Sequence, residues 1–297
     1  MNEKSHLNHL LLLTIGTILI STSGALGKFI DMPTPVIIWW RAILAALFLF
    51  IFCLYKGINL KIKNKKNRGT FFIAAVLMGA HWITYFYALK LSNVAIGMLS
   101  IFTFPVIIAL LEPLFYKTKL DPIHIVLGLM VLLGIYILSP DFSLESGHLQ
   151  GILFGVLSAL CYAIRILILK GHVANYNSTM LMFYQVAIIG VLLAPVLIFM
   201  DTTNISTQYP YVILLALMTT AIGHTLFVNS LKYFKASTAS IIGSIQPVTG
   251  IIIAYFFLNE IPTIHTFVGG ALILATVIIE SIRSKTKNGL IIEANKK

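Results

Sequence analysis

Long apolar segments separated by short polar breaks run along the whole chain. A helix that crosses a bilayer needs about 20 mainly apolar residues, and the sequence contains ten segments of this kind. We expect these spans to begin near Asn8, Pro35, Gly69, Val94, Leu120, Leu149, Ser178, Tyr209, Ala236 and Pro262. The pattern therefore predicts an all-α integral membrane protein with ten transmembrane helices.

The amino-acid composition is also typical of a protein that lies mainly within a lipid bilayer. Of the 297 residues, 58% are hydrophobic and only 10% are charged, whereas soluble domains carry about 25% charged residues. The net charge of +11 comes from basic residues in the breaks between spans. Because they do not form one soluble basic face, the charge does not indicate a nucleic-acid partner.

Basic residues should be concentrated on the cytoplasmic side of a membrane protein. If the N-terminus is inside, all but four of the 21 Lys and Arg residues fall in cytoplasmic segments. Lys28, Arg41 and Lys90 fall at or near the outer side, where Arg41 is expected to be an interfacial anchor, and Arg165 lies within a span. We predict that both termini are cytoplasmic and that the protein is a multi-pass component of the plasma (inner) membrane.

An internal repeat appears when the chain is shifted by 142 residues against itself. The pairs brought into register are Lys28 with Lys170, Lys90 with Lys232, Pro105 with Pro247, Val126 with Val268, Gly128 with Gly270 and Leu132 with Leu274. Each half then holds five spans, and an odd number means that the second half enters the membrane in the opposite sense. The expected organisation is a first repeat at 1–144, an inverted second repeat at 145–285 and a basic cytoplasmic tail at 286–297.

Three stretches of sequence resemble a known transporter family. They are Ser23–Lys28 with Arg41, the run Ala95–Pro105, and Ala236–Pro247 followed by Leu258–Pro262. With the span count, they resemble the drug/metabolite transporter superfamily of the EamA type across the whole chain. The resemblance implies a permease, often an exporter of amino acids, other metabolites or toxic compounds, with a central cavity lined by spans one, three, four, six, eight and nine. One departure is Glu112, which is displaced from the usual acidic position at the end of span four.

Two histidines stand near the middle of predicted spans. His81 lies about 18 Å into span three at 1.5 Å per residue, with Trp82 beside it and Tyr85 on the same face. In span eight, His224 lies one position from Gly223, which is the register partner of His81. An ionisable side chain at this depth is expected to face a cavity or a partner. His81 either lines the cavity or packs between helices with its ring N–H on a backbone carbonyl. No carboxylate or cysteine at helical spacing accompanies them, so we do not expect a metal site.

Further candidates for substrate binding are Tyr162, Arg165, Ser100 and Gln246. Arg165 and Tyr162 share a face of span six, and Arg165 is either a cytoplasmic headgroup anchor or a clamp for a substrate carboxylate. Ser100 either lines the cavity or lets helices approach closely. The Gln246 amide needs partners in hydrocarbon, and the adjoining Pro247 favours a kink that faces a polar cavity.

These observations favour a secondary transporter that works by alternating access between two inverted repeats. The expected cargo is a small amphipathic or zwitterionic metabolite such as an amino acid, exported by analogy with the family. A proton is the candidate coupling ion because histidine titrates near neutrality, and no phosphate-binding loop or other cofactor site is present. The other partner is the lipid bilayer, and the protein is expected to be a monomer or homodimer. The alternatives are a multi-span enzyme acting on lipid, with a histidine as base, and a non-transporting receptor.

Overall fold

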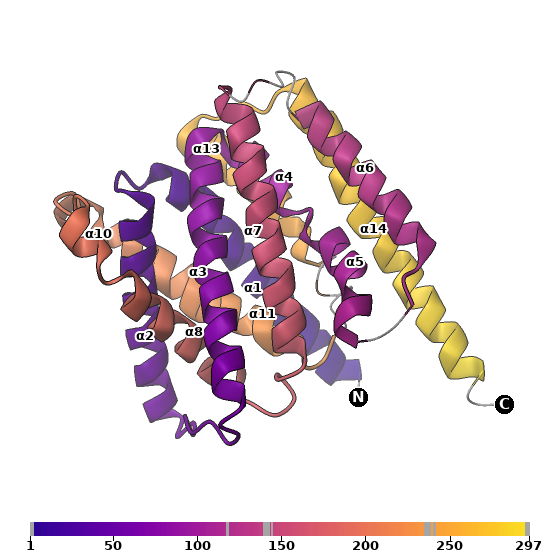
Figure 1. Ribbon diagram of the computed structural model, residues 1–297, viewed down its shortest axis with the longest axis horizontal. Coiled ribbons are helices and arrows are strands. Elements are labelled where there is room, and N and C mark those ends of the chain that lie inside the picture. The colour runs from indigo at the N-terminus through magenta and orange to yellow at the C-terminus, as the bar shows by residue number, and fades with distance from the viewer. Residues whose placement is uncertain are drawn as a thin grey trace.

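The computed structural model describes residues 3–116, 119–138, 143, 145–234, 239 and 242–294, and all regular structure in these ranges is helical (Figure 1). The helices of the first half are α1 (Glu3–Phe29), α2 (Thr34–Tyr55), α3 (Asn67–Leu91), α4 (Val94–Ile101), α5 (Phe104–Tyr116) and α6 (Pro122–Leu138). Those of the second half are α7 (Gly147–Lys170), α8 (Ser178–Leu193), α9 (Val196–Phe199), α10 (Ile205–Leu214), the π-helix η1 (Leu215–His224), α11 (Thr225–Ser230), α13 (Ile245–Leu258) and α14 (Ile264–Ala294).

Within the described part of the chain, seven helical segments are long and apolar enough to cross a membrane, and three shorter apolar helices accompany them. Three of the seven are composite: α4 with α5, α8 with α9, and α10 with η1 and α11. The shorter ones are Pro122–Leu138, Ile245–Leu258 and Ile264–Ile279. Apart from the start expected near Ala236, which lies outside the described residues, the segments begin within a few residues of the positions that hydropathy predicts.

The helices of the two halves follow one another at the spacing found in the sequence. Shifted by 142 residues, α5 (104–116) would cover 246–258, where α13 lies, and α6 (122–138) would begin at 264, where α14 begins. The packing has the same symmetry. At this offset α3 corresponds to η1 and α7 corresponds to α1, and α3 packs against α7 just as η1 packs against α1. Two further contacts, α2 with α8 and α6 with α14, each join a helix to its own counterpart. The two halves are therefore interlocked along their whole length rather than standing side by side.

Both halves have a broken helix at the same register. A turn at Phe102 and Thr103 separates α4 from α5, and a turn at Ser244, which is the register partner of Phe102, precedes α13. A proline follows each break, Pro105 in one half and Pro247 in the other, and a proline cannot donate the backbone hydrogen bond that would continue the preceding turn. The Thr103 hydroxyl donates to the Ser100 carbonyl at 2.9 Å and satisfies one backbone group at the break.

Two lysines hold helix ends together at the end of the bundle opposite the basic loop between α2 and α3. Lys28 of α1 donates to the carbonyls of Leu89 and Ser92 at 2.8 and 2.7 Å, where α3 ends. Lys90 of α3 donates in return to the Met32 carbonyl at 2.6 Å, just after α1. Cations favour the carbonyl end of a helix. This reciprocal capping explains why these two residues depart from the distribution of the other lysines.

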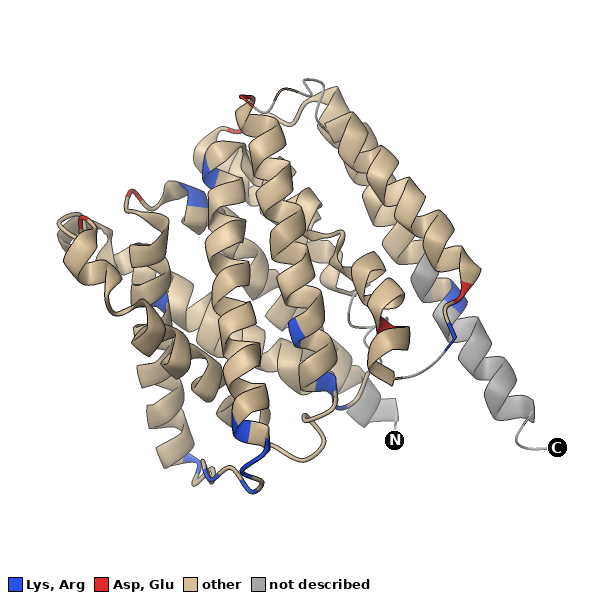
Figure 2. Ribbon diagram, viewed as in Figure 1, with Lys and Arg blue, Asp and Glu red and all other residues tan. Residues whose placement is uncertain are grey.

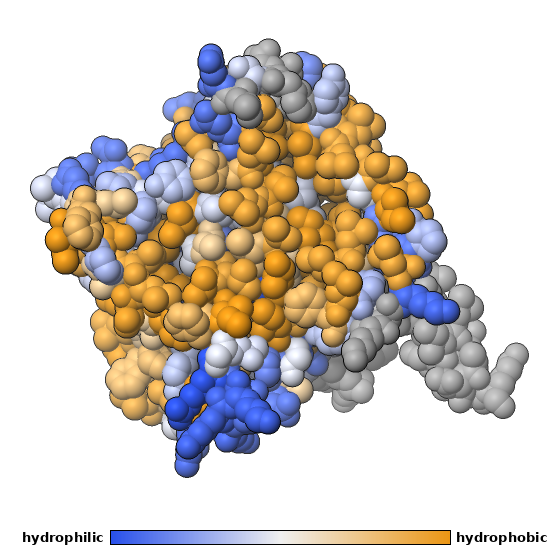
Figure 3. All heavy atoms as spheres, viewed as in Figure 1, coloured by the Kyte–Doolittle hydropathy of each residue, from blue (hydrophilic) through white to orange (hydrophobic). Residues whose placement is uncertain are grey.

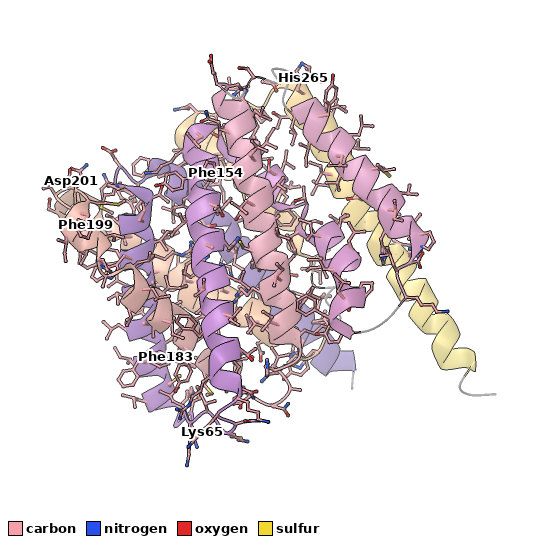
Figure 4. All side chains as sticks on the ribbon, viewed as in Figure 1. Lys65, Phe154, Phe183, Phe199, Asp201 and His265 are labelled. Carbon is pink, nitrogen blue, oxygen red and sulfur yellow. The ribbon has the colours of Figure 1, made fainter. Side chains whose placement is uncertain are left out.

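Charge and hydropathy divide the surface into a belt and two polar ends. Lys and Arg gather around the loop between α2 and α3, on the side where α1 begins and α14 ends (Figure 2). Apolar atoms cover the middle of the molecule between two hydrophilic ends (Figure 3). Lys65 lies at one end, and Asp201 and His265 lie at the other (Figure 4). The bundle therefore has the surface of a protein that spans a bilayer, with its basic end on one side.

Candidate functional site

A small cavity of about 30 Å³, lined almost entirely by buried side chains, lies where the two halves cross. Its walls come from the six spans implied by the family resemblance and also from α2. Six of the eight residues expected to bind substrate line it: His81, Trp82, Tyr85, Tyr162, His224 and Gln246. Ser100 and Arg165 are buried but do not line it. The cavity holds no more than about one or two waters, so a metabolite would enter only if the helices moved apart.

His81 both packs between helices and faces the cavity. Its Nδ1 lies 2.8 Å from Oγ of Ser158 on α7, and that hydroxyl donates to the His81 carbonyl at 2.7 Å. Because the hydroxyl proton is used by the carbonyl, Nδ1–H must be the donor to Ser158 in a neutral ring. The other nitrogen, Nε2, is then an acceptor. The ring also stacks on Tyr162, with ring centroids 4.6 Å apart.

Arg41 is not the interfacial anchor that its position near the end of a span predicted. The side chain is 1% exposed and lines the cavity from α2. Its guanidinium lies 3.9 Å from the centre of the Trp82 ring, a cation–π contact that is stronger away from water. The anchor interpretation fails because the residue faces the crossing of α2 with η1 rather than lipid, and α2 packs against η1 at this point.

A π-helical turn supplies the partners of Arg41. In η1, Thr219 and Thr220 are adjacent and fully buried. Nε of Arg41 donates to Oγ1 of Thr220 at 2.6 Å, and Nη2 donates to Oγ1 of Thr219 at 3.2 Å. The wider π-helical turn directs two consecutive hydroxyls toward one guanidinium, and such turns are frequent at functional sites. Hydropathy alone gave no signal for Thr219 and Thr220, because π-helical geometry is not encoded by apolar spacing.

Arg165 is also buried rather than anchored at the cytoplasmic surface, so that alternative is wrong. Its Nε donates to Oε1 of Gln185 on α8 at 2.6 Å, and Nη2 contacts Sδ of Met182 at 3.2 Å. The guanidinium lies 5.6 Å from the centre of the Tyr162 ring, which separates it from the cavity wall. A long side chain so enclosed cannot extend to headgroups.

Several buried polar atoms near the cavity have no partner among the described residues. They are Nη1 of Arg41, Nε1 of Trp82, Oγ of Ser100, Nη1 of Arg165 and Nδ1 of His224. Buried polar groups are normally paired because an unpaired one costs about 1–3 kcal/mol. Three of them, on Arg41, Trp82 and His224, belong to side chains that line the cavity, which indicates a site for a polar ligand or for water. A search of the described residues for three clustered His, Cys, Asp or Glu side chains finds none.

Glu112 has a local partner that explains its displaced position. Its Oε1 accepts a hydrogen bond from Nζ of Lys170 at 2.6 Å, which joins the end of α5 to the end of α7. At the opposite end, Oε2 of Glu260 accepts from the backbone N–H of Val94 at 2.7 Å and caps α4. Both acidic residues therefore close helix ends rather than contribute to the cavity.

Comparison with known proteins agrees with this architecture. The sequence matches the EamA-like transporter family over residues 7–139 and again over 149–282. It is 24% identical over 295 residues to the uncharacterized transporter YxxF of Bacillus subtilis, covering 97% of this chain and 94% of YxxF. It is 22% identical over 282 residues to the pseudopaline exporter CntI of Pseudomonas aeruginosa, covering 94% and 96%.

A solved crystal structure has the same fold, with a TM-score of 0.69 over 93% of this chain and 97% of the other at 16% identity. The family match occurs twice, once in each half, and each match contributes residues to the cavity wall. Together the two matches cover most of the chain. This protein is a multi-pass membrane protein that belongs to the EamA-like transporter family.

Proposed function

We propose that the protein is a secondary transporter that exports small amphipathic metabolites, such as amino acids or related compounds, across the plasma membrane by alternating access. Ten spans would form two inverted five-helix repeats, at 1–144 and 145–285, with both termini and the tail at 286–297 in the cytoplasm. The observation that carries the proposal is the small, buried cavity at the crossing of two halves whose helices correspond at one offset. Inverted repeats commonly place a substrate site at such a crossing.

Several features support this mechanism over a static channel or an enzyme. The cavity is too small for a metabolite and its walls are almost entirely buried, so entry from either side requires the halves to move. The breaks at Phe102 and Ser244 provide corresponding joints in the two halves, and broken helices are typical of transporter sites. Export is favoured by the similarity to CntI, which is named as an exporter.

The proposed topology predicts opposite accessibility at the two polar ends. A cysteine introduced as Lys65→Cys should react with a membrane-impermeant maleimide only after the cells are opened, whereas Asp201→Cys should react in intact cells. The reason is the concentration of basic residues at the Lys65 end, which are retained on the cytoplasmic side. The native Cys53 is buried and Cys161 partly so, and the unmodified protein measures their background. Labelling of Lys65→Cys in intact cells would reverse the orientation.

The transport proposal is tested by flux in proteoliposomes. A labelled panel of amino acids, amines, organic acids and nucleobases is offered to the wild type and to the double variant His81→Ala/His224→Ala, with and without a pH gradient. We expect saturable flux of at least one amphipathic compound in the wild type and a loss of about tenfold or more in the variant, since both rings border the cavity. Dependence on the gradient would identify a coupling proton, for which Nε2 of His81 is a candidate acceptor.

Absence of flux for the whole panel, in protein shown to be folded by size-exclusion chromatography, would contradict the transport proposal. The same substitution at His148, a residue at the start of α7 and away from the cavity, is the matched control and should leave flux unchanged.

A further inference from the structure

The guanidinium of Arg41 carries one hydrogen-bonding edge that the protein does not use. Nε and Nη2 donate to Thr220 and Thr219, and one face of the group lies on Trp82. Nη1 has no partner among the described residues although it is fully buried. Protein contacts therefore fix the guanidinium at Nε, at Nη2 and on the ring of Trp82, whereas Nη1 is unpaired within the described residues. Arg41 is one of the residues that line the central cavity.

Among the acidic side chains that the structure describes, none forms an ion pair with Arg41. The ten Asp and Glu residues of the sequence are Glu3, Asp31, Glu112, Asp121, Asp141, Glu145, Asp201, Glu260, Glu280 and Glu293. The structure describes the side chains of Asp31, Glu112, Asp121, Glu145, Asp201 and Glu260, of which Glu112 lies near the end of α5 and the others lie in the breaks between helices. A guanidinium remains charged under all ordinary conditions, and a buried charge without a counter-ion is costly. An anionic ligand in the cavity would supply the missing charge.

Arg165 makes the excess of positive charge larger without offering a second binding group. It is fully buried, its partners are the neutral Gln185 and Met182, and it does not border the cavity. Within the described residues, the two ion pairs between side chains join Lys170 to Glu112 and Arg283 to Asp121, and neither includes a buried arginine. The centre of the bundle thus favours a negative charge, and Arg41 is the cation that borders the space where that charge would lie.

The remaining groups of the cavity wall restrict the kind of anion. Trp82, which stacks against Arg41, has an unpaired Nε1–H in the same wall, and indole nitrogen only donates. Two unpaired donors on stacked side chains suit the two oxygens of a planar carboxylate. The cavity lining also includes the aromatic side chains of Phe102, Phe104 and Tyr162, which suit an organic substituent rather than a hydrated inorganic ion.

We infer that Arg41 is the residue that binds the cargo, and that the cargo is a small carboxylate or amino acid with an apolar or aromatic substituent. This inference rests on the proposed function, because it assigns the substrate class of the same cavity. The free Nη1 edge of Arg41 and Nε1–H of Trp82 bind the two carboxylate oxygens in a charge-assisted contact. The acceptor Nε2 of His81 is available for an N–H donor of the substrate, which distinguishes an amino acid from a simple organic acid.

The experiment uses Trp82 as its own reporter. In the full-length variant Trp39→Phe/Trp40→Phe, Trp82 is the one remaining tryptophan, so its fluorescence reports changes next to Arg41. Purified protein in nanodiscs is titrated with matched pairs that differ in the anionic group: L-phenylalanine against L-phenylalaninamide, and 3-phenylpropionate against 3-phenylpropionamide. Phenyl phosphate tests whether another anion is preferred. Titrations extend to about 10 mM, at which a ligand with a Kd of about 1 mM is mostly bound.

We expect at least one carboxylate to alter Trp82 fluorescence with an affinity about tenfold or more above that of its amide. Arg41→Gln should abolish this preference, and Arg41→Lys should retain part of it because a lysine keeps the charge but not the planar group. Arg68→Gln, the same substitution at an exposed arginine of the basic loop, is the matched control and should leave the preference intact. The comparison of acid with amide in protein that retains Arg41 does not depend on how the Arg41 variants fold.

The inference is overturned if carboxylates and amides bind equally, if no carboxylate in the series binds by the highest concentration, or if phenyl phosphate binds more tightly than every carboxylate. It is also overturned if Arg165→Gln, rather than Arg41→Gln, removes the preference. These outcomes are separate from failure of the transport proposal. Flux restricted to neutral or cationic compounds would leave transport standing without carboxylate selection. Carboxylate binding that depends on Arg41, without any flux, would support the binding site and contradict the transport proposal.

Discussion

Replacing Trp82 by alanine is expected to lower the free energy of unfolding by about 3–5 kcal/mol, the usual cost of deleting a large buried aromatic side chain. Trp82 is 1% exposed and is the largest fully buried side chain among the described residues. One face of its ring carries the Arg41 guanidinium at 3.9 Å, and His224 lies 5.7 Å away between ring centroids. The substitution would therefore open a void beside a buried charge and release Arg41 from its position.

Trp82→Phe separates packing from hydrogen bonding at this position. Phenylalanine keeps an aromatic face for the Arg41 cation but removes the unpaired Nε1–H. We expect the Phe variant to lose less than half of the stability that the Ala variant loses, while the flux of a carboxylate falls in both. Unfolding in detergent followed by circular dichroism measures the first quantity and proteoliposome flux the second. Equal stability of the Ala variant and the wild type would show that Arg41 does not depend on the ring.

Gly269→Ala is expected to destabilise the protein by about 1–3 kcal/mol, although alanine is normally the better helix former. Gly269 of α14 lies against Gly134 of α6, and a Cβ at Gly269 would lie 2.7 Å from the Gly134 carbonyl oxygen. It would also lie 3.2 Å from the backbone nitrogen of Leu138. Backbone atoms cannot rotate away as a side chain can, so α6 and α14 would have to separate. Small residues at membrane helix crossings permit this close approach.

Gly128→Ala provides the matched control within α6. A Cβ at Gly128 would meet only Leu110 Cδ1 at 3.7 Å, an ordinary contact. The helix propensity of alanine should then be gained without steric cost, with a stabilisation of up to about 1 kcal/mol. Thermal unfolding of the two variants in the same detergent should shift in opposite directions. If Gly269→Ala is as stable as Gly128→Ala, close packing of α6 against α14 is not required.

The two halves use the same crossing in different ways. His81 and Ser158 join α3 to α7 through hydrogen bonds. Their register partners are Gly223 and Gly16, at which a Cβ would lie 3.2 Å from the carbonyl oxygen of the other glycine. One crossing is held by a polar pair and the other by close backbone contact. The two halves therefore share the same arrangement of helices, but the hydrogen-bonded pair at this crossing, His81 with Ser158, is replaced in the other crossing by two glycines.

Apolar segments, their order and the offset of 142 residues could be predicted from the sequence because these signals are local. A stretch of about 20 apolar residues is helical in a bilayer whatever its neighbours are, since the backbone has no other means to satisfy its hydrogen bonds. Depth along a span is equally local, and it identified His81, Trp82, Tyr85 and His224 as residues near the midplane, all of which border the cavity.

Rotation of each helix about its own axis is a different matter, and only the tertiary structure decided it. Arg165 and Ser100 lie at a suitable depth but face away from the cavity, whereas Arg41 lies nearer a helix end and faces into it. Such a direction depends on which helix packs opposite, and in the case of Arg41 on the π-helical turn that presents Thr219 and Thr220. Hydropathy along the chain determines where each span lies and how deep a residue is, whereas packing between distant segments determines the direction in which each side chain points.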